Sequence, residues 1–161
     1  MKKIITLFLA LALTLSLAPC AFAKTMGSGE TQVQHLDDGS YIETTITETP
    51  SLFNGGVSLL AATTTKTKTK TSKFYNSSDA LIWQFSVKGT FTYGNGSSKC
   101  TASSVSGTSY NKYIVLSDRK AWKSGNTAYA SIVSSNINPL IPVYKKTYSL
   151  SLSCSAKGVF S

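Results

Sequence analysis

Residues 81–93 form the stretch LIWQFSVKGTFTY, and its pattern decides the fold class. One face of the pattern contains only apolar side chains and glycine: Leu81, Trp83, Phe85, Val87, Gly89, Phe91 and Tyr93. The residues between them are mostly polar, so the hydrophobic period is two, which is typical of a β-strand with one buried face. Turn-forming residues follow directly at Gly94-Asn95-Gly96. The stretch therefore predicts a long strand that leads into a hairpin, with Trp83, Phe85, Val87 and Phe91 in the core.

Shorter alternating segments lie on both sides of this strand. They cover residues 31–36, 41–47, 63–73, 99–105, 110–117, 126–134 and 143–154. Glycine, asparagine, serine and proline separate them, and no helical period continues past residue 23. This organisation indicates a sandwich or a barrel, and we predict a single all-β sandwich of the Greek-key type, immunoglobulin-like in architecture. Leu150 and Leu152 are expected to lie on the facing or neighbouring strand, and Trp122 is expected to enter the core from a polar bend.

The first 23 residues have the features of a secretory signal peptide. Two lysines precede an apolar run over residues 4–18, and the small-x-small signal Ala21-Phe22-Ala23 follows it. We predict cleavage after Ala23 and a secreted, extracellular chain. Lipidation at Cys20 is the alternative, but Pro19 stands where a lipidation signal requires a small residue.

Charge divides the rest of the chain into an acidic and a basic part, within a formal net charge of +9. Residues 24–62 contain one lysine and five acidic residues, together with the hairpin signal Asp37-Asp38-Gly39-Ser40 and an apolar connector. Residues 63–161 contain thirteen basic residues and two acidic ones. We therefore expect an acidic N-terminal segment over 24–62 and a basic β-sandwich domain over 63–161. The hairpin either docks on this domain or stays loose, because two strands alone are marginally stable in water.

Cleavage of the signal peptide would leave Cys100 and Cys154 as the cysteines of the mature chain. Two cysteines in an exported chain are most simply one disulfide, and both lie on predicted strands at inward positions. The alternative is a pair of buried thiols. A metal site is not expected, because no further cysteine and no nearby histidine would complete the ligand set.

Lysine and threonine alternate over residues 63–73, in the single low-complexity run of the sequence. At a period of two, Lys66, Lys68 and Lys70 point to the same face of a strand. A row of lysines protects an edge strand from pairing with another chain, and this is the interpretation we favour. The alternatives are a ridge that binds polyanions and a linker or processing segment.

Groups that would form a catalytic site are scarce in the sequence. The single histidine, His35, lies in the acidic hairpin, and the basic part offers only Asp79 and Asp118 as a carboxylate pair. No nucleophile elbow, phosphate loop or zinc-ligand spacing occurs, so we expect no enzyme activity, no cofactor and no metal. Three tyrosines outside the predicted inner faces are available to stack on sugar rings or bases: Tyr110, Tyr113 and Tyr129.

Several motifs together resemble one family of exported proteins. They are the acidic hairpin over 36–44, the Thr/Lys strand, Trp83 followed by Gly89-Thr90-Phe91-Thr92-Tyr93, the Cys100 strand, the run over 123–128 and the closing Leu152-Ser153-Cys154-Ser155. The chain is similar, over nearly all of its mature length, to an uncharacterised family of small secreted proteins from Gram-positive, largely clostridial, gut bacteria. The resemblance implies a secreted β domain with a disulfide, and it implies no catalytic or binding residues.

The function that we expect is that of a secreted, non-catalytic binding or interaction module that acts as a monomer at or near the cell surface. A basic domain suits an anionic cell-wall polymer, a glycan or a membrane surface as partner, and we expect no specific nucleic acid. Solubility alone is the other explanation of the charge. The alternative function is that of a bacteriocin-like toxin or secreted effector.

Overall fold

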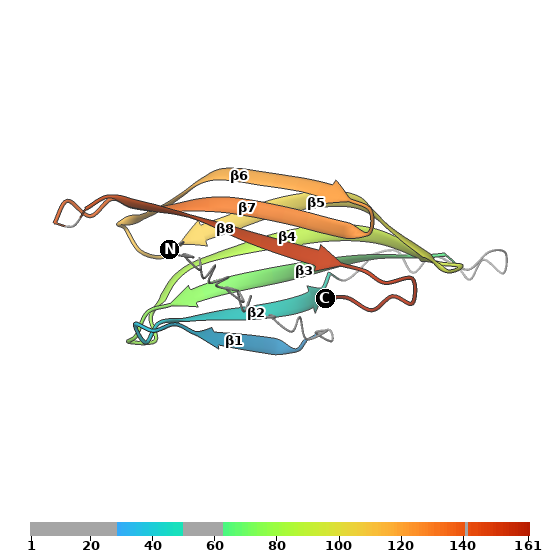
Figure 1. Cartoon of the computed structure of the whole chain (residues 1–161), viewed down its shortest axis with the longest axis horizontal. Helices are drawn as coiled ribbons and strands as arrows, with labels where there is room; N and C mark the ends of the chain where they lie inside the picture. The colour runs from blue at the N-terminus through green and yellow to red at the C-terminus, as the bar shows by residue number, and fades with distance from the viewer. Residues whose placement is uncertain (1–28, 50–62, 141) are drawn as a thin grey trace, which may run out of the picture.

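A computed structural model describes residues 29–49, 63–140 and 142–161 of the chain (Figure 1). The described residues form eight strands: β1 (Thr31–His35), β2 (Tyr41–Glu48), β3 (Thr64–Tyr75), β4 (Leu81–Gly94), β5 (Ser97–Ser109), β6 (Ile114–Ser124), β7 (Thr127–Asn136) and β8 (Tyr144–Ser153). None of the described residues belongs to a helix long and apolar enough to cross a membrane. The predicted signal peptide, Cys20 and the apolar connector over 50–62 lie outside the described residues.

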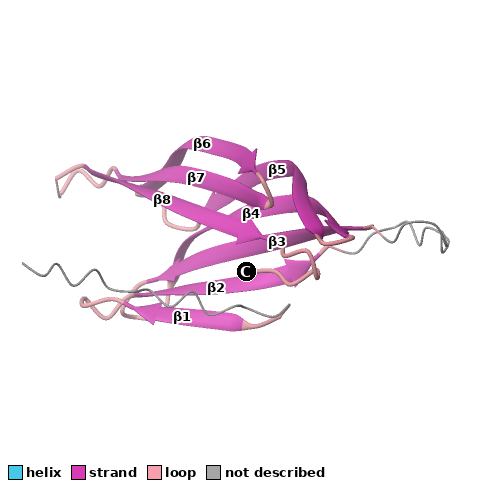
Figure 2. Ribbon diagram, turned by 45° about the vertical axis from the view of Figure 1, so that its right-hand side comes forward, coloured by secondary structure: helices cyan, strands magenta, loops and turns pink. Residues whose placement is uncertain are grey.

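The strands form two antiparallel sheets that pack face to face, as Figures 1 and 2 show. One sheet has the order β1-β2-β3-β4-β5, and the other has the order β6-β7-β8. The all-β, sandwich-like architecture is therefore confirmed. The Greek-key, immunoglobulin-like topology is not confirmed, because each strand pairs only with its neighbours in sequence and both sheets are meanders. Tight turns such as Gly94–Gly96 join consecutive strands and favour this local pairing.

The long strand β4 lies between β3 and β5 and provides the centre of the core. Its predicted core residues Trp83, Phe85, Val87 and Phe91 are all buried, which confirms the choice of face. The opposite layer contributes buried side chains from β7 and β8: Ala128, Ala130, Ile132 and Leu152. Leu150 packs against the same core and is partly buried. Each large apolar side chain buried here contributes about 1.5–3 kcal/mol to folding.

The two sheets pack closely where Gly89 of β4 faces Ala128 of β7. A Cβ atom on Gly89 would lie 2.9 Å from the Ala128 Cβ and closer still to the Phe91 ring. Real carbon atoms do not approach so closely without displacing a neighbour. Gly89 therefore permits the tight packing of the layers at this point.

Strand β6 continues through the predicted bend, and Trp122 is not in the core. Asp118 has a positive φ of 47°, and the pairing with β7 shifts between Ser117 and Lys120. This β-bulge adds one residue to β6, and one extra residue exchanges the two faces of a strand. Trp122 is consequently 46% exposed on the outer face, so the prediction that it enters the core is wrong.

The acidic hairpin is part of the larger sheet. Strand β2 pairs with β3 over eight residues, from Tyr41↔Tyr75 to Glu48↔Lys68. The hairpin therefore docks, and the expected boundary between residues 62 and 63 falls between two strands of the same sheet. On the far side of this sheet, β5 lies against β6, where Arg119 Nη2 donates to the Gly107 carbonyl oxygen at 3.1 Å.

Candidate binding surfaces

The lysine row of β3 lies inside a sheet and not at its edge. β2 flanks β3 on one side and β4 on the other, so the edge-strand interpretation is wrong. Lys66, Lys68 and Lys70 do share one face, but it is the core-side face, where they pair across with Phe91, Gly89 and Val87. β3 is not an edge strand because β2, the second strand of the acidic hairpin, pairs with it.

Two of these lysines meet the same carboxylate on β2. Glu48 Oε2 lies 2.6 Å from Lys68 Nζ, and Glu48 Oε1 lies 3.2 Å from Lys66 Nζ. Hydrogen bonds from Lys68 and then Lys66 lower the pKa of Glu48. Lys68 is only 3% exposed, and its Nζ lies 5.3 Å from the centre of the Phe160 ring. These positions do not favour a polyanion-binding ridge, because Lys66 and Lys68 already have an anionic partner.

The cysteines are free thiols in this structure, and the predicted disulfide is wrong. Cys100 on β5 and Cys154 after β8 are both buried in the same core cluster, so their inward positions are confirmed. They are not at disulfide distance. The two cysteines bond to neighbouring residues of the β6–β7 turn, Cys100 N–H to the Gly125 carbonyl oxygen at 2.9 Å and Cys154 N–H to that of Asn126 at 3.1 Å. Each thiol donates instead to a nearby carbonyl oxygen, that of Ala102 at 3.2 Å and that of Ser155 at 3.4 Å.

A pocket of about 460 Å³ opens beside Cys100, at the end of the sandwich where β5 begins and β6 ends. Its lining consists of Ser97, Ser98, Lys99, Cys100, Lys123, Ser124 and Gly125. Burial raises the pKa of the Cys100 thiol, so the thiol is protonated at neutral pH and is a weak nucleophile. The lining has no carboxylate or imidazole to act as a base, and its residues are better suited to contact than to catalysis.

The outward side chains of the three-stranded sheet form a second surface, which we call the β6–β8 face. Its members alternate with the buried residues of the three strands: Val115, Ser117, Lys120, Trp122, Thr127, Tyr129, Ser131, Val133, Lys145, Thr147, Ser149 and Ser151. The rings of Trp122 and Tyr129 stack with centroids 5.3 Å apart and an interplanar angle of 5°. The face thus combines one aromatic pair, two ammonium groups and many hydroxyls, and the carboxylate of Asp118 lies beside it, where Oδ2 accepts a hydrogen bond from Ser117 Oγ at 3.4 Å.

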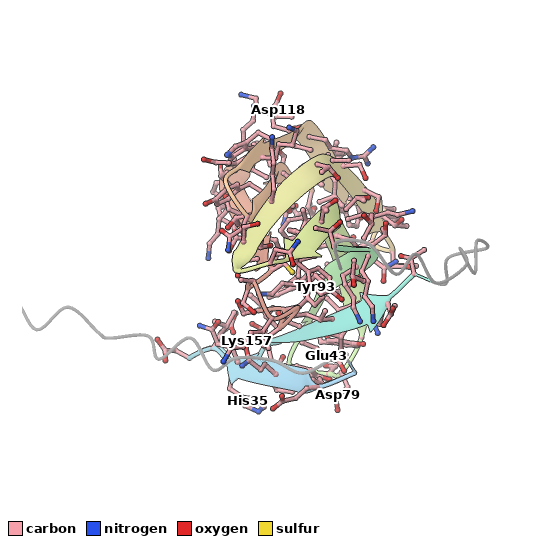
Figure 3. All side chains as sticks on the ribbon, turned by 90° about the vertical axis from the view of Figure 1, so that its right-hand side faces the viewer. His35, Glu43, Asp79, Tyr93, Asp118 and Lys157 are labelled. Atoms are coloured by element: carbon pink, nitrogen blue, oxygen red, sulfur yellow. The ribbon has the colours of Figure 1, made fainter. Side chains whose placement is uncertain are left out.

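Positive charge gathers around this face, and negative charge gathers elsewhere. Residues 114–153 contain five basic residues and a single acid, Asp118. The ion pairs among the described residues all join β2 to β3, through Glu48 and Glu43. Figure 3 places His35, Glu43 and Asp79 at one end of the molecule and Asp118 at the other. Asp79 and Asp118 therefore do not form the carboxylate pair that the sequence left open.

The predicted aromatic residues are distributed unequally. Tyr110 and Tyr113 are exposed around the connection from β5 to β6, and Lys112 Nζ lies 4.9 Å from the centre of the Tyr113 ring. Of the three tyrosines, Tyr129 alone stacks on another ring in the described part of the chain. Its partner Trp122 was missed by sequence reasoning because the bulge at Asp118 leaves no hydrophobic signal. The sequence feature that could have indicated the bulge is an aspartate between two strand-like segments, since aspartate tolerates a positive φ.

No three histidine, cysteine or acidic side chains of the described residues come together as metal ligands. Comparison of the chain with protein-family models, with curated proteins and with solved structures gives no match.

Proposed function

We propose that the chain is an exported, non-catalytic binding module that acts near the cell surface as a monomer and binds an anionic polysaccharide through the β6–β8 face. The observation that carries the proposal is the Trp122–Tyr129 stack beside lysines and hydroxyls, on a face where Lys120 and Lys145 outnumber the one carboxylate beside it, that of Asp118. Export rests on the signal-peptide pattern of residues 1–23.

Each group on this face suits one part of an acidic sugar polymer. The aromatic pair offers apolar ring surface for the C–H groups of a sugar, and serine and threonine hydroxyls offer hydrogen bonds. Lys120 and Lys145 supply positive charge, and both are exposed. A single exposed charge pair contributes at most about 1 kcal/mol, so useful affinity requires several contacts along a chain. A repetitive polymer supplies them.

The remaining chemistry of the molecule supports binding over catalysis. The two thiols are buried and protonated, because burial raises the pKa of both Cys100 and Cys154. His35 lies on β1 at the acidic end, on the opposite side of the molecule from Asp118 of β6 (Figure 3). The acidic end would repel a polyanion, whereas the basic sheet would attract it, so the charge distribution also orients the ligand.

The test is a binding titration of the purified mature chain with heparin as the anionic polysaccharide, neutral dextran as control and inorganic polyphosphate as a polyanion without sugar rings. The double variant Lys120→Ser/Lys145→Ser should weaken heparin binding at least about fivefold. Lys88→Ser/Lys157→Ser removes the same charge outside the face and should change it less than about twofold. Trp122→Ala should weaken binding of heparin and leave polyphosphate unchanged. Equal losses in both double variants, or no binding of heparin, would overturn the proposal.

A further inference from the structure

The two sheets differ in width, and this leaves part of the larger sheet without a facing strand. β7 lies opposite β4 and β5, and β8 lies opposite β3 and β4. Figures 1 and 2 both show β1 and β2 extending beyond β8 on the side away from β6. A strand added to the free edge of β8 would therefore lie over β2, where the smaller sheet has no strand among the described residues.

The free edge of β8 carries unpaired backbone groups. In an antiparallel sheet, alternate residues direct both N–H and C=O toward the same neighbour. Ser153 directs its groups away from β7, because its N–H and C=O bond to Ser161 at 2.9 and 3.2 Å. By the same alternation, Lys145, Thr147, Ser149 and Ser151 direct theirs to the free edge. In the described part of the chain these groups have no backbone partner, and such an edge is a template for strand pairing.

The C-terminal residues already begin this pairing. Cys154 and Phe160 form an antiparallel bridge next to the Ser153–Ser161 bonds. The Phe160 side chain points between the sheets, where its ring centroid lies 5.4 Å from that of Phe91. A longer strand on this edge would likewise direct every second side chain inward, over β2 and β3.

On the core side of β3, next to this edge, one lysine forms no ion pair with any described residue. Lys70 is half-buried between Ile46 on β2 and Val87 on β4, which are both fully buried. It forms none of the ion pairs among the described residues, unlike its neighbours in the row. Burial lowers the pKa of Lys70, because an apolar environment disfavours the ammonium ion. A carboxylate placed beside it would offset that cost.

We propose that the free edge of β8 binds an extended acidic peptide of a partner protein, which adds to β6–β8 as a fourth, antiparallel strand and directs a glutamate or aspartate inward to Lys70. Backbone hydrogen bonds supply affinity in this mode of recognition, and the inward side chain supplies specificity. The site uses the backbone groups of β8, whereas the β6–β8 face uses outward side chains, so the proposed strand addition does not depend on the proposed polysaccharide binding.

The probe is the capped peptide Thr-Glu-Thr-Glu-Thr-Glu-Thr, titrated into the full mature chain by isothermal calorimetry. With the glutamates inward, the threonine N–H groups face β8 and the glutamate N–H groups face solvent. N-methylation of the threonines should abolish binding, and N-methylation of the glutamates should leave it within about twofold. Similar binding of both methylated peptides, or no binding of the parent peptide, would overturn strand addition.

Three variants of the chain test the same contacts from the other side. Ser149→Pro removes an edge N–H and should weaken binding at least about tenfold, whereas Ser149→Ala keeps the N–H and should bind as the parent does. Lys70→Met should weaken the glutamate peptide at least about tenfold and leave the matched glutamine peptide unchanged. Circular dichroism melting curves confirm that each variant is folded. A Lys70→Met variant that binds the glutamate peptide at full affinity would overturn the assignment of Lys70.

Discussion

The lysines of β3 and the lysines of β6 and β8 occupy opposite kinds of environment. The β3 lysines alternate with threonine in the sequence and lie on the core-side face: Lys66, Lys68 and Lys70. The first two form ion pairs with the same carboxylate, that of Glu48. Lys120 and Lys145 are far apart in the sequence, yet they lie on one exposed face with no ion pair among the described residues. The lysines that cluster in the sequence are therefore not the ones that are available to bind a ligand. Whether a lysine stabilises the fold or remains free for a ligand depends on the strand beside it.

The acidic hairpin is the cause of this difference. β2 places Glu48 next to Lys66 and Lys68 and Glu43 next to Lys73, so the larger sheet supplies carboxylates for three of its own lysines. No acidic strand lies beside β6 or β8 in the described part of the molecule. We therefore make four predictions about how much the core and the charged side chains of each region contribute to the free energy of unfolding.

The core face that the β3 lysines share with β4 should dominate stability. Phe85→Ala should lower the free energy of unfolding by about 3–5 kcal/mol, because it removes a buried ring and leaves a cavity. Ser86→Ala on the opposite face of the same strand removes only the hydroxyl pair with Thr71 and should cost about 1 kcal/mol or less. Thermal unfolding followed by circular dichroism measures both. An unchanged melting temperature for Phe85→Ala would mean that the lysines do not lie on the core face.

Removal of the shared carboxylate should have the next largest effect. Glu48→Gln removes the carboxylate that lies 2.6 Å from the buried Lys68 ammonium and should cost about 1–3 kcal/mol in urea unfolding. The matched control is Glu43→Gln, because Lys73 Nζ lies 3.8 Å from Glu43 and both side chains are partly exposed. That control should cost less than about 1 kcal/mol. Equal costs for the two variants would show that the burial of Lys68 is unimportant.

Acid should remove the contribution of Glu48. Its pKa in the folded protein is lowered from 4.5 by the hydrogen bonds from Lys68 and Lys66. A lowered pKa means that the contribution is complete above the unfolded-state pKa and is lost as the pH falls from there through the folded-state pKa. The difference in urea midpoint between the parent chain and Glu48→Gln should therefore shrink below about pH 4.5. A constant difference between pH 7 and pH 2 would contradict the ion pair.

The exposed lysines should have the smallest effect on folding. Lys120→Ser/Lys145→Ser should change the free energy of unfolding by no more than about 0.5 kcal/mol, because both side chains are exposed and neither forms an ion pair with a described residue. The measurement is again urea unfolding, at low and at high salt. A loss as large as that of Glu48→Gln would place both lysine groups in the same structural role and remove the contrast between them.

The core and the cysteines show how far sequence reasoning extends. Alternation predicted the buried face of β4 and the inward positions of Cys100 and Cys154 correctly, because the direction of a side chain follows from its place along a strand. The pairing of the cysteines was predicted wrongly, because two inward residues on opposed sheets need not meet. Trp122 was also predicted wrongly, because the bulge at Asp118 exchanges the faces of β6 without changing the sequence pattern around it.

The sequence by itself determined most of the strands, their turns and, outside the bulged strand β6, the face on which a side chain lies. These properties are local, because they depend on a period of two and on residues that tolerate turns. The tertiary structure alone decided which strand stands beside which. It brought Glu48 to Lys68, left Lys70 without an ion pair among the described residues and gathered Trp122, Tyr129 and Lys120 on one face. Strand pairing joins residues that are distant in the chain, so no local pattern records the neighbour that decides whether a charge is buried, paired or free.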